Sequence, residues 1–157
     1  MKLFKVLLTI AVIFLLMNVS FSETVVGHYG TDKNINHTEE IKETVRGAVE
    51  DVEWMSCKSK DEVRSVLARY YEGYLLDDIT EKSWDFIKEP TDWYSRAKIV
   101  DMAIISDDGE KATVEALIGI EDVDSGHNEV GKGLFTMAKS DKGWRINYTS
   151  FSWEEGK

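Results

Sequence analysis

Hydrophobic residues recur every three or four positions through the first half of the chain, a spacing that predicts amphipathic helices. Three helices are predicted in this way, over residues 38–55, 60–76 and 80–88. Thr38 is a suitable N-cap for the first helix, and Ser59 with Glu62 forms a capping box for the second. The third should end before Pro90, because proline cannot continue a helix.

Apolar and polar residues alternate through the second half of the chain, which predicts β-strands. The expected strands are 97–106, 112–121, 129–139 and 144–153, separated by turn signals rich in Asp and Gly. Gly131 and Gly133 remove side chains from one face of the third strand, which permits strong bending or a close approach of another backbone. Helices followed by an antiparallel meander predict an α+β fold, with the helices covering one face of the sheet.

The last strand ends in aromatic residues whose direction follows from simple alternation. Trp144, Ile146 and Tyr148 are expected on one face, and Phe151 and Trp153 on the opposite face. A homodimer formed through a face of the sheet is one arrangement that this chain could adopt. Phe151 and Trp153 are the candidate residues for such a contact.

The first residues have the layout of a secretory signal peptide. Lys2 and Lys5 precede an apolar run over residues 6–17, and Ser20 and Ser22 are the small residues that a signal peptidase requires. The alternative is an uncleaved membrane anchor, although the run is shorter than the roughly 20 residues that span a bilayer. The expected organisation is a signal peptide, a flexible lead-in and one α+β domain, over residues 1–22, 23–37 and 38–157.

Composition and charge narrow the class of protein. The chain has 157 residues, which is enough for one domain, and a formal net charge of -10. This charge excludes nucleic acid as a partner and disfavours anionic membrane surfaces. Cys57 is the only cysteine, so an internal disulfide is impossible. A short leader without disulfides is typical of an exported bacterial protein.

No pattern of residues predicts a catalytic, cofactor or metal site. His28, His37 and His127 lack the spacing of transition-metal ligands. The acidic loop over residues 121–129 lacks the spacing of a calcium loop. Cys57 has no histidine near it in the sequence and is interpreted as a passive residue. We therefore assign no catalytic residue, no metal and no cofactor.

Aromatic residues on and just after the second and third predicted helices, with Asp101 of the first predicted strand, are the candidates for a ligand pocket. Aromatic rings provide contact area, and their polar atoms can orient a ligand. The alternative is that they only pack the helices against the sheet. The candidate pocket residues are Tyr70, Tyr71, Tyr74, Trp84, Trp93 and Asp101.

From about residue 60 to residue 153 the chain resembles the nuclear transport factor 2-like superfamily, which includes the ketosteroid isomerase and SnoaL-like groups. The segments that carry the resemblance are 63–71, 84–87 and 143–148, the last reading Gly-Trp-Arg-Ile-Asn-Tyr. The resemblance implies a strongly curved antiparallel sheet, cone-like and cystatin-like, wrapped round a helix to enclose a cavity. Family isomerases use a Tyr and buried carboxylates, but no residue here matches that pattern position by position.

These observations favour an exported, non-catalytic domain that binds a small apolar ligand or a protein partner through its curved sheet or cavity. One fold serves many functions, so two alternatives stay open. The first is a small cavity enzyme of the isomerase or dehydratase type, which would need Asp85 or Asp101 buried beside a tyrosine. The second is a membrane-anchored assembly component of a secretion system, which would require the leader to be retained.

Overall fold

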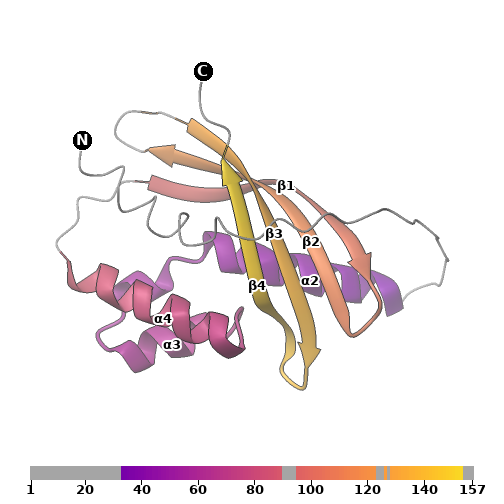
Figure 1. Cartoon of the computed structure of the whole chain (residues 1–157), viewed down its shortest axis with the longest axis horizontal. Coiled ribbons are helices and arrows are strands. Elements are labelled where there is room, and N and C mark those ends of the chain that lie inside the picture. Colours follow the sequence, from indigo (N-terminus) through magenta and orange to yellow (C-terminus); the bar gives the residue numbers. More distant parts are fainter. Residues whose placement is uncertain (1–32, 90–94, 123–125, 127, 154–157) are drawn as a thin grey trace.

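The computed structural model describes residues 33–89, 95–122, 126 and 128–153, with side chains from His37 onward. The described chain forms helices followed by one four-stranded antiparallel sheet with strand order β1-β2-β3-β4 (Figure 1). The helices are α2 (Lys33–Glu50), the 3-10 helix η1 (Glu53–Ser56), α3 (Lys60–Leu67) and α4 (Gly73–Lys88). The strands are β1 (Ser95–Asp107), β2 (Lys111–Asp122), β3 (Asn128–Ser140) and β4 (Gly143–Trp153). The predicted α+β class is confirmed.

Three sequence predictions fall outside the described residues. These are the signal peptide at 1–22, most of the flexible lead-in, and the placement of Trp93, His28 and His127. Within the described part, none of the helices combines the length and the apolar character that a membrane span requires.

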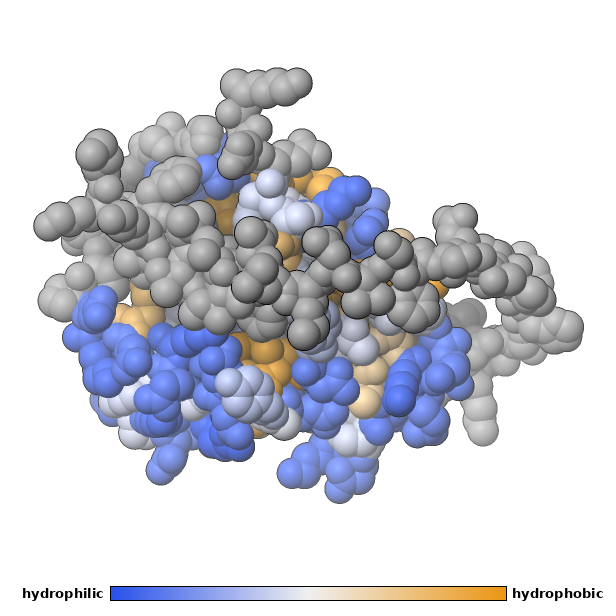
Figure 2. Space-filling model, viewed as in Figure 1, coloured by the Kyte–Doolittle hydropathy of each residue, from blue (hydrophilic) through white to orange (hydrophobic). Residues whose placement is uncertain are grey.

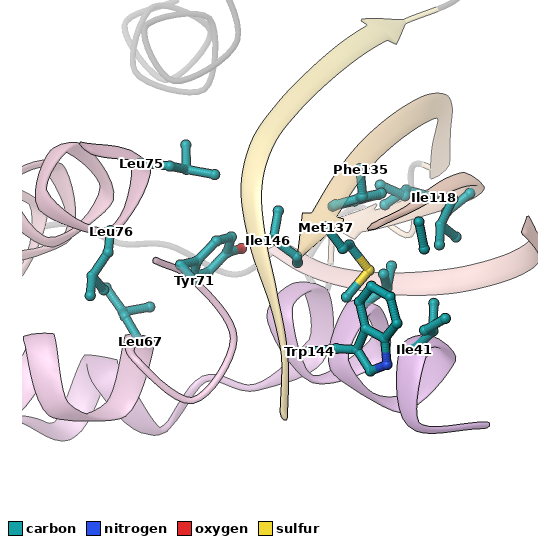
Figure 3. Packing of buried hydrophobic residues seen from close by; sticks show 14 of the residues in the cluster. Ile41, Leu67, Tyr71, Leu75, Leu76, Ile118, Phe135, Met137, Trp144 and Ile146 are labelled. Carbon is teal, nitrogen blue, oxygen red and sulfur yellow. The ribbon is translucent and has the colours of Figure 1, made fainter. Parts of the chain in front are cut away.

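Helix α2 packs across the concave face of the sheet, and the strands bend around it (Figure 1). Ile41 and Val45 of α2 are buried against the sheet. Opposite them, β2 alternates as the sequence predicted, with Val114 and Ala116 buried and the residues between them directed outward. Figure 3 shows Ile41 beside Trp144 and Met137 in this core.

The predicted ends of the first helix are wrong. Helix α2 begins at Lys33, so Thr38 lies inside the helix and does not cap it, and the predicted lead-in overlaps its first turns. The helix ends at Glu50, and the backbone then continues into η1. The polar first turns carry no apolar stripe, which is why periodicity did not detect them.

The break between the second and third helices also differs from the prediction. One helix was expected to continue to residue 76, but α3 ends at Leu67 and α4 begins at Gly73. Between them, Tyr71 forms a parallel bridge with Ile146 of β4. The Ile146 amide donates to the Tyr70 carbonyl (2.8 Å), and the Glu72 amide donates to the Ile146 carbonyl (3.0 Å). Gly73 has a positive φ of 60°, which lets the chain turn into α4.

The predicted faces of β4 are corrected by a bulge. The pairing of β3 with β4 shifts between Thr136 and Met137, so Asn147 is an extra residue in β4. Alternation therefore changes phase, and Tyr148 points to the convex face with 47% of its surface exposed. Phe151 and Trp153 pack against the buried core on the same concave face as Trp144. They do not lie on the opposite face, where simple alternation placed them.

Candidate functional site

The concave face of the sheet has two ends that differ in packing. At the end under α2, Val114, Met137 and Trp144 are completely buried. At the opposite end Ile118 is buried, but Ile99, Ile120, Phe151 and Trp153 remain partly exposed although they face the same side of the sheet. We call this second region the broad end and define it by Ile99, Ile118, Ile120, Gly131, Gly133, Phe151 and Trp153.

Two glycines form the floor of the broad end. A Cβ atom on Gly131 would lie 2.2–2.7 Å from three ring atoms of Trp153, so the indole rests directly on the β3 backbone. A Cβ atom on Gly133 would lie 2.8–3.0 Å from side-chain atoms of Phe135, Ile118 and Phe151. Phe135 and Phe151 meet edge to face, with 5.7 Å between ring centroids. The glycines therefore create space for a closely packed aromatic layer.

Apolar side chains make up most of the broad end, with two carboxylates beside them: Glu129 pairs with Ile120 on the same face, and Glu50 Oε1 accepts from the Ile99 amide (2.8 Å). Among the described residues, the buried polar ones are Thr80 and Thr149. Hydrophilic residues dominate the surface over α3 and α4, whereas apolar surface is visible between α4 and β4 (Figure 2). A ligand held at the broad end would thus be recognised by shape and apolar contact.

Tyr70 and Tyr71 are both engaged with the C-terminal half of α2. The Tyr71 hydroxyl donates to the Ala48 carbonyl (3.0 Å), and burial raises the pKa of this tyrosine well above its usual value. Figure 3 shows its ring between the helices and β4. The Tyr70 hydroxyl donates to Asp51 Oδ2 (2.7 Å), and its ring covers Gly47. Both hydroxyls are therefore used in holding α2 to the segment that follows α3.

A network of charged groups surrounds the Tyr70 hydroxyl. Arg69 donates to Asp51 (2.9 Å) and to Glu53 (2.7 Å), and its guanidinium lies 5.6 Å from the centre of the Tyr70 ring. Burial opposes ionisation of Asp51. The hydrogen bonds from Tyr70 and the Glu53 amide, with the charge of Arg69, outweigh burial and lower the pKa of Asp51. Burial, followed by the hydrogen bond to Asp51, raises the pKa of Tyr70.

The remaining candidate pocket residues do not gather around Tyr70 and Tyr71. Tyr74 is 85% exposed near the start of α4. Trp84 is half-buried on α4, with the Lys88 ammonium 5.8 Å from its ring centre. Asp101 is exposed and pairs with Leu117 on the convex face, where its carboxylate accepts from the Met102 amide (2.9 Å). Trp93 lies outside the described residues.

The sequence analysis did not include Phe151 and Trp153 in the pocket, because simple alternation placed them on the opposite face. The signal that could have found them is the glycine pair at 131 and 133. Two glycines on one face of a central strand leave a space that neighbouring strands must fill. The aromatic residues of β4 are opposite them in register.

A separate open groove of about 490 Å³ lies between η1 and α3. Its lining includes Cys57, Glu53, Asp61 and Glu62. Burial, together with the nearby charges of Glu62 and Glu53, raises the pKa of the Cys57 thiol, which favours its unreactive protonated form. The described residues contain no group of three or more His, Cys, Asp or Glu side chains that could hold a metal ion.

Comparisons with known proteins bear on the fold. No protein-family model and no curated protein matches the sequence. A proposed aromatic ring hydroxylase from Novosphingobium aromaticivorans is similar in structure, with a TM-score of 0.59 and 13% identity over 78% of this chain and 92% of that one. A nuclear transport factor 2-like protein with a cystatin-like fold, from the same organism, gives a TM-score of 0.55 and 13% identity over 80% and 86% of the two chains.

These similarities confirm the fold that the sequence resemblance implied. The chain has the nuclear transport factor 2-like, cystatin-like fold, with helices packed on a four-stranded antiparallel sheet. At 13% identity the similarity establishes the fold alone, and one fold supports many functions. The function must therefore be argued from the side chains of this protein.

Proposed function

Starting from a nuclear transport factor 2-like fold, we propose that this protein is an exported, non-catalytic domain that binds a small apolar ligand at the broad end. The observation that carries the proposal is the contrast along one sheet face. Trp144 and Met137 are completely buried under α2, whereas Ile99, Phe151 and Trp153 are only partly covered. Apolar side chains that remain partly exposed on a concave surface mark a binding site.

The positions of the carboxylates favour binding over catalysis. The enzyme alternative requires an acid buried beside a tyrosine, since desolvation is what raises a carboxyl pKa to a useful value. Asp85 and Asp101, the two acids suggested for this role, are both exposed. Asp51 does contact a tyrosine, but its pKa is lowered, which is the wrong direction for a general acid. Binding is therefore the function that the described residues support best.

Probe binding tests the proposal directly. N-phenyl-1-naphthylamine is an uncharged probe whose fluorescence rises in apolar surroundings, and it should bind the purified protein with saturation. Ile120→Ser, on the concave side of β2, should weaken binding about fivefold or more, because it removes apolar contact area. Val130→Ser removes a comparable side chain from the neighbouring convex surface, where Val130 is 42% exposed, and should change binding little.

Equal effects of Ile120→Ser and Val130→Ser would show that the probe does not distinguish the two faces, and would reject the broad end as the site. Absence of saturable binding to the wild-type protein would count against a small apolar ligand altogether. A protein partner would then be the remaining form of the binding hypothesis.

Export rests on the leader sequence and needs its own experiment. The charged start at Lys2 and Lys5 and the serines at 20 and 22 support cleavage after Ser22. N-terminal sequencing of the protein recovered from a secreting host should begin at Glu23. A chain that retains Met1 would replace the exported form with the membrane-anchored alternative.

A further inference from the structure

The indole of Trp153 occupies the position over Gly131 that a side chain of β3 would otherwise fill. Three of its ring atoms would lie within 2.7 Å of a Cβ at that position, far closer than a real Cβ tolerates. The slot over Gly131 is therefore shaped to hold a flat ring against the backbone. What fills it is a ring of the protein itself.

Trp153 is less buried than Phe135 and lies nearer the end of β4 than Phe151. Phe135 is completely buried on a central strand, and Phe151 packs against it edge to face. Trp153 is half-buried and belongs to β4, the edge strand, near the end of that strand. Rotating the Trp153 side chain away would expose the glycine floor without disturbing the buried core under α2.

We propose that Trp153 is a replaceable plug, and that the ligand of the broad end is an uncharged planar ring that takes the place of its indole. This inference rests on the proposed function and adds the ligand class and the change in conformation. The ring must be planar because it packs flat on the backbone of Gly131. It is uncharged because the side chains that close over the neighbouring Gly133, those of Ile118, Phe135 and Phe151, offer no partner for a charge.

Displacement of the plug has a thermodynamic consequence. If the slot is occupied by Trp153 most of the time, the ligand binds only the minor open state, and its apparent affinity falls by the open fraction. Trp153→Ala removes this competition. With free indole as the probe, this variant should bind at least about tenfold more tightly than the wild type, measured by isothermal titration calorimetry.

Two further variants show that the effect belongs to this slot. Trp84→Ala removes the same type of side chain from α4 and should leave indole binding unchanged. Adding Gly131→Val to Trp153→Ala refills the floor of the slot and should abolish the gain. Circular dichroism of each variant confirms that the fold is retained.

A measurement on the wild-type sequence makes the test independent of any cavity-creating variant. In protein labelled with 5-fluorotryptophan, the resonance of Trp153 should shift as indole or N-phenyl-1-naphthylamine binds, while that of the buried Trp144 stays constant. Assignment follows from the Trp→Phe variants. If the wild type binds N-phenyl-1-naphthylamine but the Trp153 signal does not move and Trp153→Ala gains no affinity, the plug is refuted while the proposed function stands. If no protein in the series binds either probe, both proposals fail.

Discussion

Because Gly47 contacts Tyr70, the mutation Gly47→Ala should change the free energy of unfolding in a direction that depends on whether Tyr70 is present. A Cβ atom at position 47 would lie 2.3 Å from Cε1 and 2.7 Å from Cζ of Tyr70. Ordinary carbon contacts are about 3.5–4.0 Å, so Gly47→Ala must displace the ring by roughly 1 Å or more. That movement also strains the 2.7 Å hydrogen bond from the Tyr70 hydroxyl to Asp51.

The two contributions can be weighed. Replacing a helical glycine with alanine stabilises a helix by about 0.5–1 kcal/mol. Overpacking costs about 1–3 kcal/mol, and loss of a hydrogen bond to a charged group costs about 1.5–3 kcal/mol. The steric cost prevails, so Gly47→Ala should destabilise the wild type by about 1–3 kcal/mol. In a Tyr70→Ala background only the helical gain remains, and the same change should stabilise by about 0.5–1 kcal/mol.

Urea unfolding of the four proteins of this double-mutant cycle, followed by circular dichroism, measures both signs. The coupling energy between positions 47 and 70 should exceed about 1.5 kcal/mol. A Gly47→Ala variant that is equally stabilising in both backgrounds would show that Tyr70 does not pack on α2. The structural explanation for why Tyr70 is engaged with α2 would then be wrong.

Three further predictions concern single contacts. Tyr71→Phe removes the hydroxyl that donates to the Ala48 carbonyl. The free energy of unfolding, measured in urea, should fall by about 1 kcal/mol. An unchanged midpoint of the urea unfolding curve would contradict that hydrogen bond. Because the pKa of Asp51 is lowered in the folded state, its stabilisation is complete above the ordinary carboxyl pKa of about 3.9 and is lost as the pH falls through the folded value. Unfolding measured from about pH 5 to about pH 2 should therefore lose less stability in Asp51→Asn than in the wild type, and parallel curves would refute the assignment. Glu50→Ala removes the carboxylate that accepts from the Ile99 amide (2.8 Å), so hydrogen exchange at Ile99 should accelerate while that at Val114 does not.

The strands were predictable because their signals are local. Turn residues and a period of two fixed the positions of all four strands to within about two residues, and Gly109 and Gly143 have the positive φ angles that such turns favour. The fold class followed from the order of the elements. No distant contact was needed for either conclusion.

The errors arose where distant parts of the chain determine local structure. The helix break around Tyr71 depends on a bridge to Ile146, which no helical periodicity can reveal. The faces of the last strand depend on the bulge at Asn147, which is a property of pairing with β3.

The surroundings of the candidate site residues also depend on distant contacts. The predicted members Tyr70 and Tyr71 were chosen as aromatic residues on a helix, but the structure uses their hydroxyls to hold α2. Phe151 and Trp153 become part of the broad end only once the register with Gly131 and Gly133 is known.

The isoleucine methyl groups allow the most direct test of the binding surface. Ile99, Ile118 and Ile120 mark the broad end, Ile41 marks the buried end, and Ile105 is 58% exposed outside the concave core. Methyl-labelled protein titrated with N-phenyl-1-naphthylamine should show chemical-shift changes at the three broad-end isoleucines, with Ile41 and Ile105 unaffected. Changes centred on Ile105, or none at Ile99, Ile118 and Ile120 despite saturable binding, would contradict the assignment of the broad end as the ligand site.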